Sequence, residues 1–510
     1  MIIHPTNQKK WSPRHETFVQ AIDNLYDLAN DDTGNVLTDY NASTTGIQGI
    51  LQDAIQTNRR LRVVGGEWSF TKITATDGII LNTKPLNLSM RITASSVHGQ
   101  YVNTANDLYF SQCGVSVQEL SERLKVRGRS LKTSGASNGQ TIAGALSTGT
   151  HGSAFTVGAF PEFVVGLHLI VSPTRHIWLE RASYPVASDT FISKIGAEPV
   201  RNDDLFKAAL VSFGSFGFIH GVMIETVPLF LYEAYRRRMP LDALLEESMR
   251  RLDFSDLPLP HPSEKPYHFQ VVVNPYDLDK GAYVTTMYKR SYSQTYTPPS
   301  ISPAGVGPGD DAPTFVGLIT QVAPALVPSV VTAITKQQYP PYENVWGTHG
   351  EIFSSTAFHG KVLSAAVAIS ADKVSEVLSL LLDLNQTAGP FTGIFAFRFV
   401  KGTDATLGFT RFDTTCVVEL DGVYSTDTVQ FCDALWDALE AAGIPFAFHW
   451  GKLLNLSKTR LRTMYSDTSV DAWIKARNTL MREEDSLKLF TNQAMIDWGL
   501  DTILVPNPIV

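Results

Sequence analysis

The sequence predicts an α+β fold built in two parts. The first third of the chain alternates helix and strand signals, whereas residues 362–450 contain two strand–helix–strand units, which is typical of one sheet with helices packed on it. The chain has 510 residues, of which 44% are hydrophobic and 18% charged. This length and composition indicate a globular protein of two or three domains with a large core.

The charge and the cysteine content exclude several classes of function. A net charge of −8 argues against nucleic acid as the main partner, because phosphate binding needs a basic surface. Cys113, Cys416 and Cys432 are too few and too scattered for a disulfide framework or a zinc site, so we expect no metal. The N-terminus lacks the apolar stretch of a signal peptide, and we expect a cytoplasmic protein.

The first part begins with a predicted helix that Ser43 or Thr44 caps, followed by short strands at 61–66 and 78–83. The apolar residues that predict this helix are spaced three and four apart: Ile47, Ile50, Leu51, Ala54 and Ile55.

Further along, a strand at 108–114 leads into a second helix, whose start is marked by a capping box of Ser116 and Glu119. Residues 163–171 and 176–181 are then predicted to be paired strands.

The second part begins with strands at 267–274 and 282–289, and a Pro/Gly-rich loop at 297–313 interrupts it. The two strand–helix–strand units follow, and they predict one sheet with helices on one face. The expected boundaries are 1–230 for the first domain, 231–450 for the second, and 451–510 for a segment that packs back on the first.

Residues 312–335 form an uncharged window about long enough to cross a bilayer. The window also contains Pro313, Pro324, Pro328 and Gln321, which interrupt a membrane helix. We therefore favour a buried or lid segment, and we do not expect contact with a membrane.

Two glycine-containing loops carry the signal for a bound cofactor. The stretch "RVVGGEWSF" places Gly65 and Gly66 after a strand, where backbone N–H groups can approach phosphate oxygens closely. The second loop, 139–153, is uncharged and rich in small residues, which suits contact with a flat, bulky cofactor. Neither loop is a Rossmann or P-loop motif. His151 in the second loop either braces that loop or contacts the cofactor.

Four stretches in order, "RVVGGEWSF", "QTIAGALSTGTHGS", "GSFGFIHGV" and "HWGK", resemble the flavin oxidoreductases of the vanillyl-alcohol oxidase/p-cresol methylhydroxylase fold. The chain is most similar to the aldonolactone oxidase and alditol oxidase branch, and "GTHGS" and "HWGK" are the specific stretches. The resemblance covers residues 36–230 and the ends of the later strands. It implies a two-part FAD-binding domain of the p-cresol methylhydroxylase type with an α+β substrate domain, called the cap.

The resemblance also implies FAD as cofactor, with its diphosphate on the first loop and its adenine end near Gly214, Gly217 and Val222. The residues implied to bind FAD are Val64, Gly65, Gly66, Glu67, Trp68, Ser69, Phe70, Gly144, Ser147, Thr148, Gly149, His151, Gly152, Ser153, Gly214, Gly217, Val222 and Lys452.

Trp68 stands where many relatives carry the histidine that bonds covalently to the flavin, and an indole does not form that bond. None of the cysteines lies in the glycine-rich loop where some relatives make a second attachment. We therefore expect noncovalent FAD. Glu67, beside Trp68, is more simply explained as a solvated or backbone-bonded carboxylate than as a catalytic group.

Two isolated charges on predicted cap strands are the candidates for catalysis. Arg398 shares a strand face with Ile394 and Ala396, and Glu419 lies in the apolar run "TTCVVEL". A buried charge needs a partner or a ligand, so these two form a salt bridge, a substrate site, or both.

The resemblance places Arg398 at a substrate-binding arginine, whereas Ala396 replaces a hydroxyl-binding glutamate. Glu419 falls at the position of a proposed base, and Lys452 matches a lysine near the flavin. A substrate less hydroxylated than a polyol is therefore plausible.

The implied activity is oxidation of a CH–OH group of a small alcohol, sugar, polyol or lactone by hydride transfer to flavin N5. Glu419, or His449, takes the hydroxyl proton, and Arg398 and Lys452 stabilise negative charge. The reduced flavin passes electrons to O2 or another acceptor. Two alternatives stay open: oxidation or oxidative cyclisation of an apolar substrate in secondary metabolism, and a dehydrogenase that uses a quinone or protein acceptor.

Overall fold

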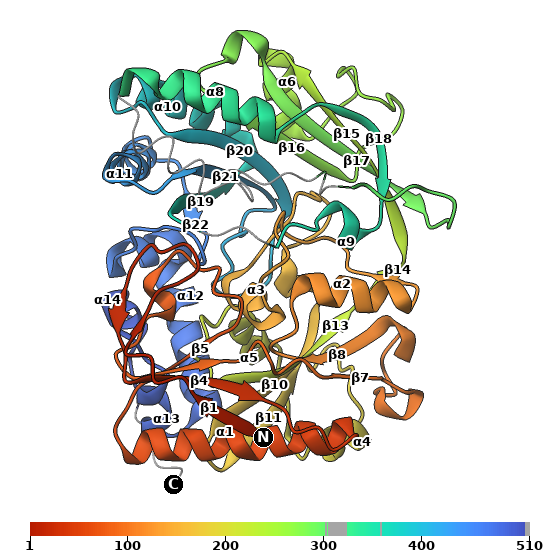
Figure 1. The fold of residues 1–510 in the computed structure, drawn as a ribbon, viewed down its shortest axis with the longest axis vertical. Coiled ribbons are helices and arrows are strands. Elements are labelled where there is room, and N and C mark those ends of the chain that lie inside the picture. The colour runs from red at the N-terminus through yellow and green to blue at the C-terminus, as the bar shows by residue number, and fades with distance from the viewer. Residues whose placement is uncertain (301–302, 304–323, 357–359, 505–510) are drawn as a thin grey trace.

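The computed structural model describes residues 1–300, 303, 324–356 and 360–504. Figure 1 shows two layers along the long axis: the N-terminal elements and the last helices lie in the lower half, and one large sheet with its helices lies in the upper half. The mixed α/β architecture agrees with the predicted fold class.

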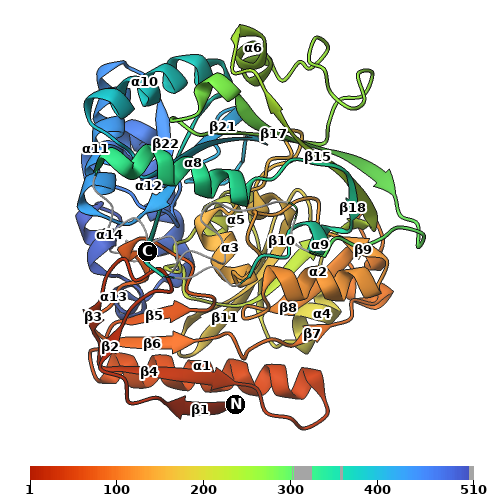
Figure 2. The same ribbon diagram turned by 45° about the horizontal axis from the view of Figure 1, so that its top comes forward.

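The lower half contains two sheets. In the first, β1 (Ile2–Pro5), β4 (Asn24–Ala29), β6 (Ile79–Asn82) and β5 (Leu61–Val64) lie in that order, with β4, β6 and β5 parallel. Figure 2 shows these strands as a row beside the long helix α1 (Val36–Gln56). The second sheet has the order β12 (Glu198–Arg201), β11 (Arg175–Glu180), β10 (Val164–Ser172), β13 (Phe218–Glu225), β8 (Leu108–Gln112), β7 (Ser89–Met90).

Helix α1 begins earlier than its apolar spacing indicates, so the predicted cap at Ser43 or Thr44 is wrong. Asn35 is the cap, and its side chain accepts from the backbone N–H groups of Leu37 and Thr38. Ser43 and Thr44 lie inside the helix, where both hydroxyls contact the buried ring of His220. Of the five apolar residues that predicted the helix, Ile47, Leu51 and Ala54 are buried, and Ile50 and Ile55 are half-buried.

The second predicted helix is confirmed as α2 (Val117–Val126). Ser116 and Glu119 form the expected capping box, because each side chain bonds the backbone N–H of the other residue. The predicted pairing of strands is also confirmed, since β10 and β11 are antiparallel neighbours.

The upper half is an eight-stranded antiparallel sheet that we call the cap sheet. Its order is β18 (Tyr342–Gly347), β15 (Phe230–Met239), β17 (Ala282–Ser291), β16 (His268–Val273), β20 (Gly393–Lys401), β21 (Thr414–Val423), β19 (Val362–Ser370), β22 (Phe446–Phe448). The strand–helix–strand units are confirmed, with α10 (Val374–Thr387) between β19 and β20, and α11 (Thr426–Ala441) between β21 and β22.

Helices cover both faces of the cap sheet, which corrects the expectation of one covered face. Phe395 and Phe397 of β20 share a core with α10 and α11. Ile394 and Ala396, which alternate with them, instead pack with Val327 and Val331 of α8 (Val327–Gln338). Alternation along β20 therefore directs Arg398 to the α8 side of the sheet.

Helix α8 holds part of the apolar window that the sequence singled out. Residues 312–323 of that window lie outside the described residues. Val327, Val331 and Thr335 are buried, as a buried or lid segment requires. Among the described residues, no helix has both the length and the apolar character needed to cross a membrane.

The chain returns to the lower half after β22. Helices α12 (Lys458–Met481), α13 (Glu484–Leu489) and α14 (Gln493–Asp497) follow one another there. The indole N–H of Trp473 donates to the carbonyl of Val211 at 3.0 Å, and Nε of Arg477 donates to the carbonyl of Ser215 at 2.9 Å. These bonds join the C-terminal helices to the segment just before β13.

All three cysteines are buried and free. Burial raises the pKa of the Cys113 thiol to about 12. In the described part of the chain, no group of three or more His, Cys, Asp or Glu side chains is placed to hold a metal ion.

Candidate active site

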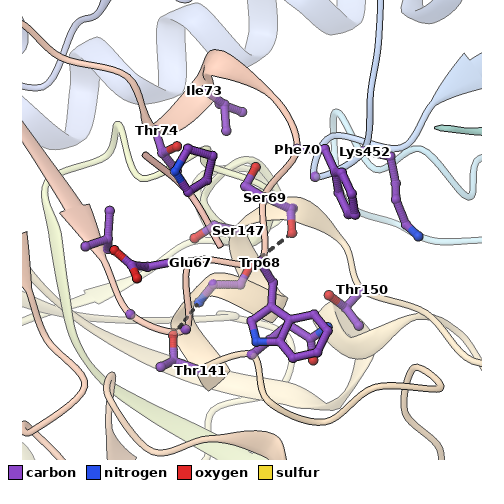
Figure 3. A pocket seen from close by; sticks show the side chains of 18 of the residues that line it. Glu67, Trp68, Ser69, Phe70, Ile73, Thr74, Thr141, Ser147, Thr150 and Lys452 are labelled. Atoms are coloured by element: carbon purple, nitrogen blue, oxygen red, sulfur yellow. Dashed lines mark hydrogen bonds between the residues drawn. The ribbon is translucent and has the colours of Figure 1, made fainter. Parts of the chain in front are cut away.

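A long cavity lies between the two halves, and both glycine-containing loops line it. The first loop leaves β5 at Gly65 and ends at Phe70, and Figure 3 shows its side chains around the cavity. A Cβ on Gly65 would lie 2.4 Å from Oγ1 of Thr141, and a Cβ on Gly66 would lie 2.5 Å from the carbonyl of Gly139. The paired glycines therefore allow the two loops to pack against each other.

The second loop contains the short helix α3 (Ile142–Thr148), which ends at Gly149 in the left-handed region with φ of 75°. The indole of Trp68 lies against this loop, because a Cβ on Gly139 would be 2.6 Å from its Cζ2. Trp68 thus fills the space between the two loops.

Most residues predicted to bind the cofactor line this cavity. They are Val64, Gly65, Gly66, Glu67, Trp68, Ser69, Phe70, Gly144, Ser147, Thr148, His151, Gly214, Gly217 and Lys452.

Four predicted residues do not line the cavity. Gly149 ends α3, and Gly152 packs against Thr133 and Ser134. Ser153 is fully buried, and its hydroxyl bonds the backbone of Phe269 and Phe399 in the cap sheet. Val222 is buried in β13, within the main core. These four residues lie behind the cavity lining and do not face the cavity.

At the cap end of the cavity, Arg398 and Glu419 form a buried ion pair. Nε of Arg398 lies 2.9 Å from Oε2 of Glu419, although its N–H does not point along that line, so the contact is electrostatic rather than a hydrogen bond. Both side chains also line the cavity. The buried salt bridge, one of the two readings that the sequence left open, is therefore present, and both of its side chains lie at the cavity.

The other oxygen of Glu419 faces the cavity. Oε1 lies 3.7 Å from Nζ of Lys452 and 3.8 Å from Nε2 of His151. Nδ1 of His151 lies 3.0 Å from the carbonyl of Gly152, so it carries the proton and Nε2 is an acceptor. Burial, and then the Arg398 cation, lower the pKa of His151 to about 3, so the ring is neutral.

His449 also lines the cavity, but its ring is engaged by the turn that follows β22. The backbone N–H of Gly451 donates to Nδ1 of His449 at 3.0 Å, which leaves the proton on Nε2. Burial, followed by the neighbouring His151 and Lys452, lowers the pKa of His449 well below its usual value. The ring presents a donor to the cavity rather than a base.

Sequence reasoning missed a second carboxylate, Asp421. It lies two residues after Glu419 on the same face of β21, it lines the cavity, and it is buried. The hydroxyl of Ser364 donates to Oδ1 of Asp421 at 2.6 Å, and Lys452 donates to that hydroxyl in turn. Burial raises the pKa of Asp421, the Lys452 cation opposes that rise, and the Glu419 charge adds to it. The period of two along β21 was the signal that could have found Asp421.

The N-terminal residues Trp11, Pro13 and His15 also line the cavity, and no sequence signal assigned them. The ring of His15 stacks on Phe70 at 4.1 Å between centroids. Phe70 also contacts the cap end: Nζ of Lys452 lies 5.6 Å from the centroid of its ring, and its backbone N–H donates to the carbonyl of Gly451 at 2.9 Å. Figure 3 shows the side chains of Phe70 and Lys452 next to each other.

Comparison with known proteins indicates FAD as the ligand of this cavity. Residues 40–178 match the family described as FAD binding domain. The chain is 26% identical over 206 residues to D-arabinono-1,4-lactone oxidase of Yarrowia lipolytica, a match that covers 40% of this chain and 35% of that protein. It is 23% identical to L-gulono-1,4-lactone dehydrogenase of Mycobacterium tuberculosis, over 83% of this chain and 88% of that protein.

A solved structure of cholesterol oxidase from Brevibacterium sterolicum has the same fold, with a TM-score of 0.68 and 13% identity over 97% of each chain. At this identity the likeness concerns the fold alone.

The residues of the cavity fit FAD. Away from the Arg398–Glu419 pair, polar atoms of residues that line the cavity lack a hydrogen-bond partner within the described part of the chain, among them Ser69 Oγ, Thr74 Oγ1 and Gln140 Oε1. A ligand with phosphate and ribose oxygens along its length satisfies such atoms, and the glycine-containing loops let it approach the backbone. The cavity lining and the family match over residues 40–178 therefore both indicate FAD as the cofactor.

Proposed function

We propose that the protein oxidises a CH–OH group of a small hydroxylated lactone or sugar derivative, using noncovalently bound FAD, and that O2 or another acceptor reoxidises the cofactor. The observation that carries this proposal is the group of Glu419, Arg398 and Lys452, which faces the same cavity as the FAD-binding loops. The lactone is suggested by the names of the relatives, and the match spans 35% of the Yarrowia protein.

FAD, when bound, would supply the hydride acceptor for the C–H bond of the substrate. The substrate hydroxyl would lie to one side of Oε1 of Glu419 and Nε2 of His151, two acceptors 3.8 Å apart, and donate its single proton to Glu419. Oε1 of Glu419 takes the hydroxyl proton. Arg398, which neutralises Oε2 of the same carboxylate, and Lys452 stabilise the negative charge that develops on the substrate oxygen.

Asp421 changes the expectation about the substrate. Ala396 lacks a hydroxyl-binding group. In the pairing of β20 with β21, Ala396 lies opposite Glu419, and Ile394 lies opposite Asp421. Asp421 therefore lies diagonally across from Ala396 on the same sheet face and supplies a carboxylate close to where the glutamate is missing. A substrate with at least one further hydroxyl group suits this arrangement better than a simple alcohol.

The purified protein tests this proposal directly. We expect a flavin absorption spectrum that L-gulono-1,4-lactone or D-arabinono-1,4-lactone bleaches without oxygen, whereas 1-propanol and cholesterol do not. Admitting air or a quinone then separates an oxidase from a dehydrogenase. Bleaching by cholesterol alone would support the apolar-substrate alternative.

The Asp421→Asn variant tests the second hydroxyl contact. Its KM for a lactone should rise by about 10-fold or more, because a charged hydrogen-bond acceptor becomes neutral. A change of the same size for a substrate with a single hydroxyl group would contradict this role of Asp421.

A further inference from the structure

The N-terminal hairpin, residues 10–21, lies outside the part of the chain that matches the FAD binding domain, yet it packs on the first FAD-binding loop. The indole N–H of Trp11 donates to Oε1 of Glu67 at 2.7 Å. The backbone N–H of Arg14 donates to the carbonyl of Glu67 at 3.1 Å. The hydroxyl of Thr17 donates to the carbonyl of Phe70 at 3.0 Å. The hairpin thus contacts both ends of the segment Glu67–Phe70.

Glu67 poses an electrostatic problem for a loop that holds a diphosphate. A carboxylate free to turn into the cavity would repel the two negative charges of that group. Glu67 adopts a φ of 59°, an uncommon conformation for a residue other than glycine, so its backbone is held by its surroundings. In Figure 3 the side chains of Glu67 and Trp68 leave the loop in different directions. The hydrogen bond from Trp11 holds the Glu67 carboxylate on the side of the hairpin.

The hairpin also supports Phe70 at the other end of the segment. The rings of His15 and Phe70 stack with 6° between their planes. Phe70 in turn contacts Lys452 through its ring and Gly451 through its backbone. On the cap side, the N–H of Gly360, two residues before β19, donates to the carbonyl of Arg14 at 3.2 Å. The hairpin therefore contacts both the FAD-binding loop and the segment that leads into the cap sheet.

We propose that the N-terminal hairpin is a working part of the FAD site: Trp11 holds Glu67 away from the diphosphate, and His15 supports Phe70. The loop keeps its FAD-binding shape in this way without a covalent bond to the flavin. This inference rests on the proposed noncovalent FAD. It assigns Trp11 and His15 as positioning residues for the cofactor.

The test measures the Kd for FAD of the FAD-free protein by quenching of flavin fluorescence. Trp11→Phe should raise Kd by about 10-fold or more, because Glu67 loses its donor and is free to turn toward the diphosphate. Glu67→Gln should change Kd by less than about 3-fold, since a neutral amide still accepts the bond from Trp11. In the double variant W11F/E67Q, the neutral amide removes the repulsion, so Kd should return to within about 3-fold of that of E67Q.

Trp346→Phe is the matched control, because this indole N–H donates to Asn344 at 2.6 Å and Trp346 does not line the FAD cavity. Its Kd should stay within about 2-fold of the wild type. An unchanged Kd in W11F, or a double variant as weak as W11F, overturns the inference. If W11F does not fold, E67Q decides, since a loss of about 10-fold there would mean that Glu67 itself binds FAD. A wild-type protein that binds no FAD contradicts the proposed function instead.

Discussion

Oε1 of Glu419 and Nε2 of His151 face each other across 3.8 Å, and both atoms are hydrogen-bond acceptors. Two acceptors do not bond each other, so either atom can accept a hydrogen bond from a donor placed to one side of the pair. The cavity that both residues line gives a substrate hydroxyl access to that position. This geometry leads to the first prediction.

Glu419→Gln should slow flavin reduction by about 100-fold to 10,000-fold, because the amide has the shape of the carboxylate but does not accept the hydroxyl proton. Anaerobic stopped-flow absorbance measures this rate.

The alternative is that Glu419 only pairs with Arg398. The variant would then lose about 3 kcal/mol of stability, yet its bound substrate would reduce the flavin at nearly the normal rate. Glu233→Gln is the matched control: Glu233 is a buried glutamate of the cap sheet, 2.7 Å from Nε of Arg290, and it does not line the cavity. This control should lose stability and keep its rate of flavin reduction.

Arg398→Ala and Lys452→Met should each slow flavin reduction by about 100-fold or more while FAD stays bound, because each removes a cation that stabilises the developing alkoxide. Single-turnover reduction under saturating substrate checks this prediction. Arg290→Ala, which removes a cap arginine paired outside the cavity, provides the comparison. A cavity variant that matches the wild-type rate has no part in the chemistry.

FAD should be released when the protein is precipitated with acid, because Trp68 stands at the position of the usual attachment histidine. The yellow colour is then found in the supernatant. Flavin fluorescence on the protein band of a denaturing gel is the contrary result. His15 should be replaced next in that case, because its ring lies 5.6 Å from that of Trp68 and lines the same cavity.

The FAD-free protein should lose stability as the pH falls below about 6.5, the ordinary pKa of histidine. Burial lowers the pKa of His220 and of His349 to about 3, and burial together with Arg398 does the same for His268. Between about pH 6.5 and pH 3 the unfolded chain binds protons that the folded one does not, so each such ring costs about 1.4 kcal/mol per pH unit.

Denaturant unfolding at pH 7, 6 and 5 measures this slope. His220→Gln should reduce it, since one buried imidazole is removed while Ser43 and Gln112 keep a polar neighbour. A free energy of unfolding that stays constant over this range would show that the folded protein protonates these rings.

The sequence predicted the parts of the site that local patterns encode. Gly65 and Gly66 predicted the first FAD-binding loop. The isolated charges Arg398 and Glu419 in apolar strands predicted the cap end of the cavity. Their close approach rests on the pairing of β20 with β21, where Ala396 is opposite Glu419. The sequence indicated this pairing because β20 and β21 are consecutive strands in the chain.

The residues that were missed depend on contacts between distant segments. Ser364 reaches Asp421 because β19 pairs with β21, although α10 and β20 lie between them in the chain, and no local pattern predicts that register. Trp11 and His15 belong to the N-terminal hairpin. Their partners, Glu67 and Phe70, lie in the loop after β5, far from the hairpin in the sequence. The helix start at Asn35 was missed because Ser43 and Thr44 are residue types that often cap helices. In the structure their hydroxyls instead contact His220 from inside the helix.

The hydrogen bond from Phe70 to Gly451 has a consequence for which segments can be exchanged between proteins of this fold. In the proposed function Lys452 acts on the substrate together with the cap sheet, but the turn that carries it is bonded to the cofactor loop. In a chimera that takes its cap strands from another protein of this fold, residues 449–452 should therefore be kept with the cofactor half. New substrate pockets can then be exchanged as strands, while the lysine stays in register with the flavin.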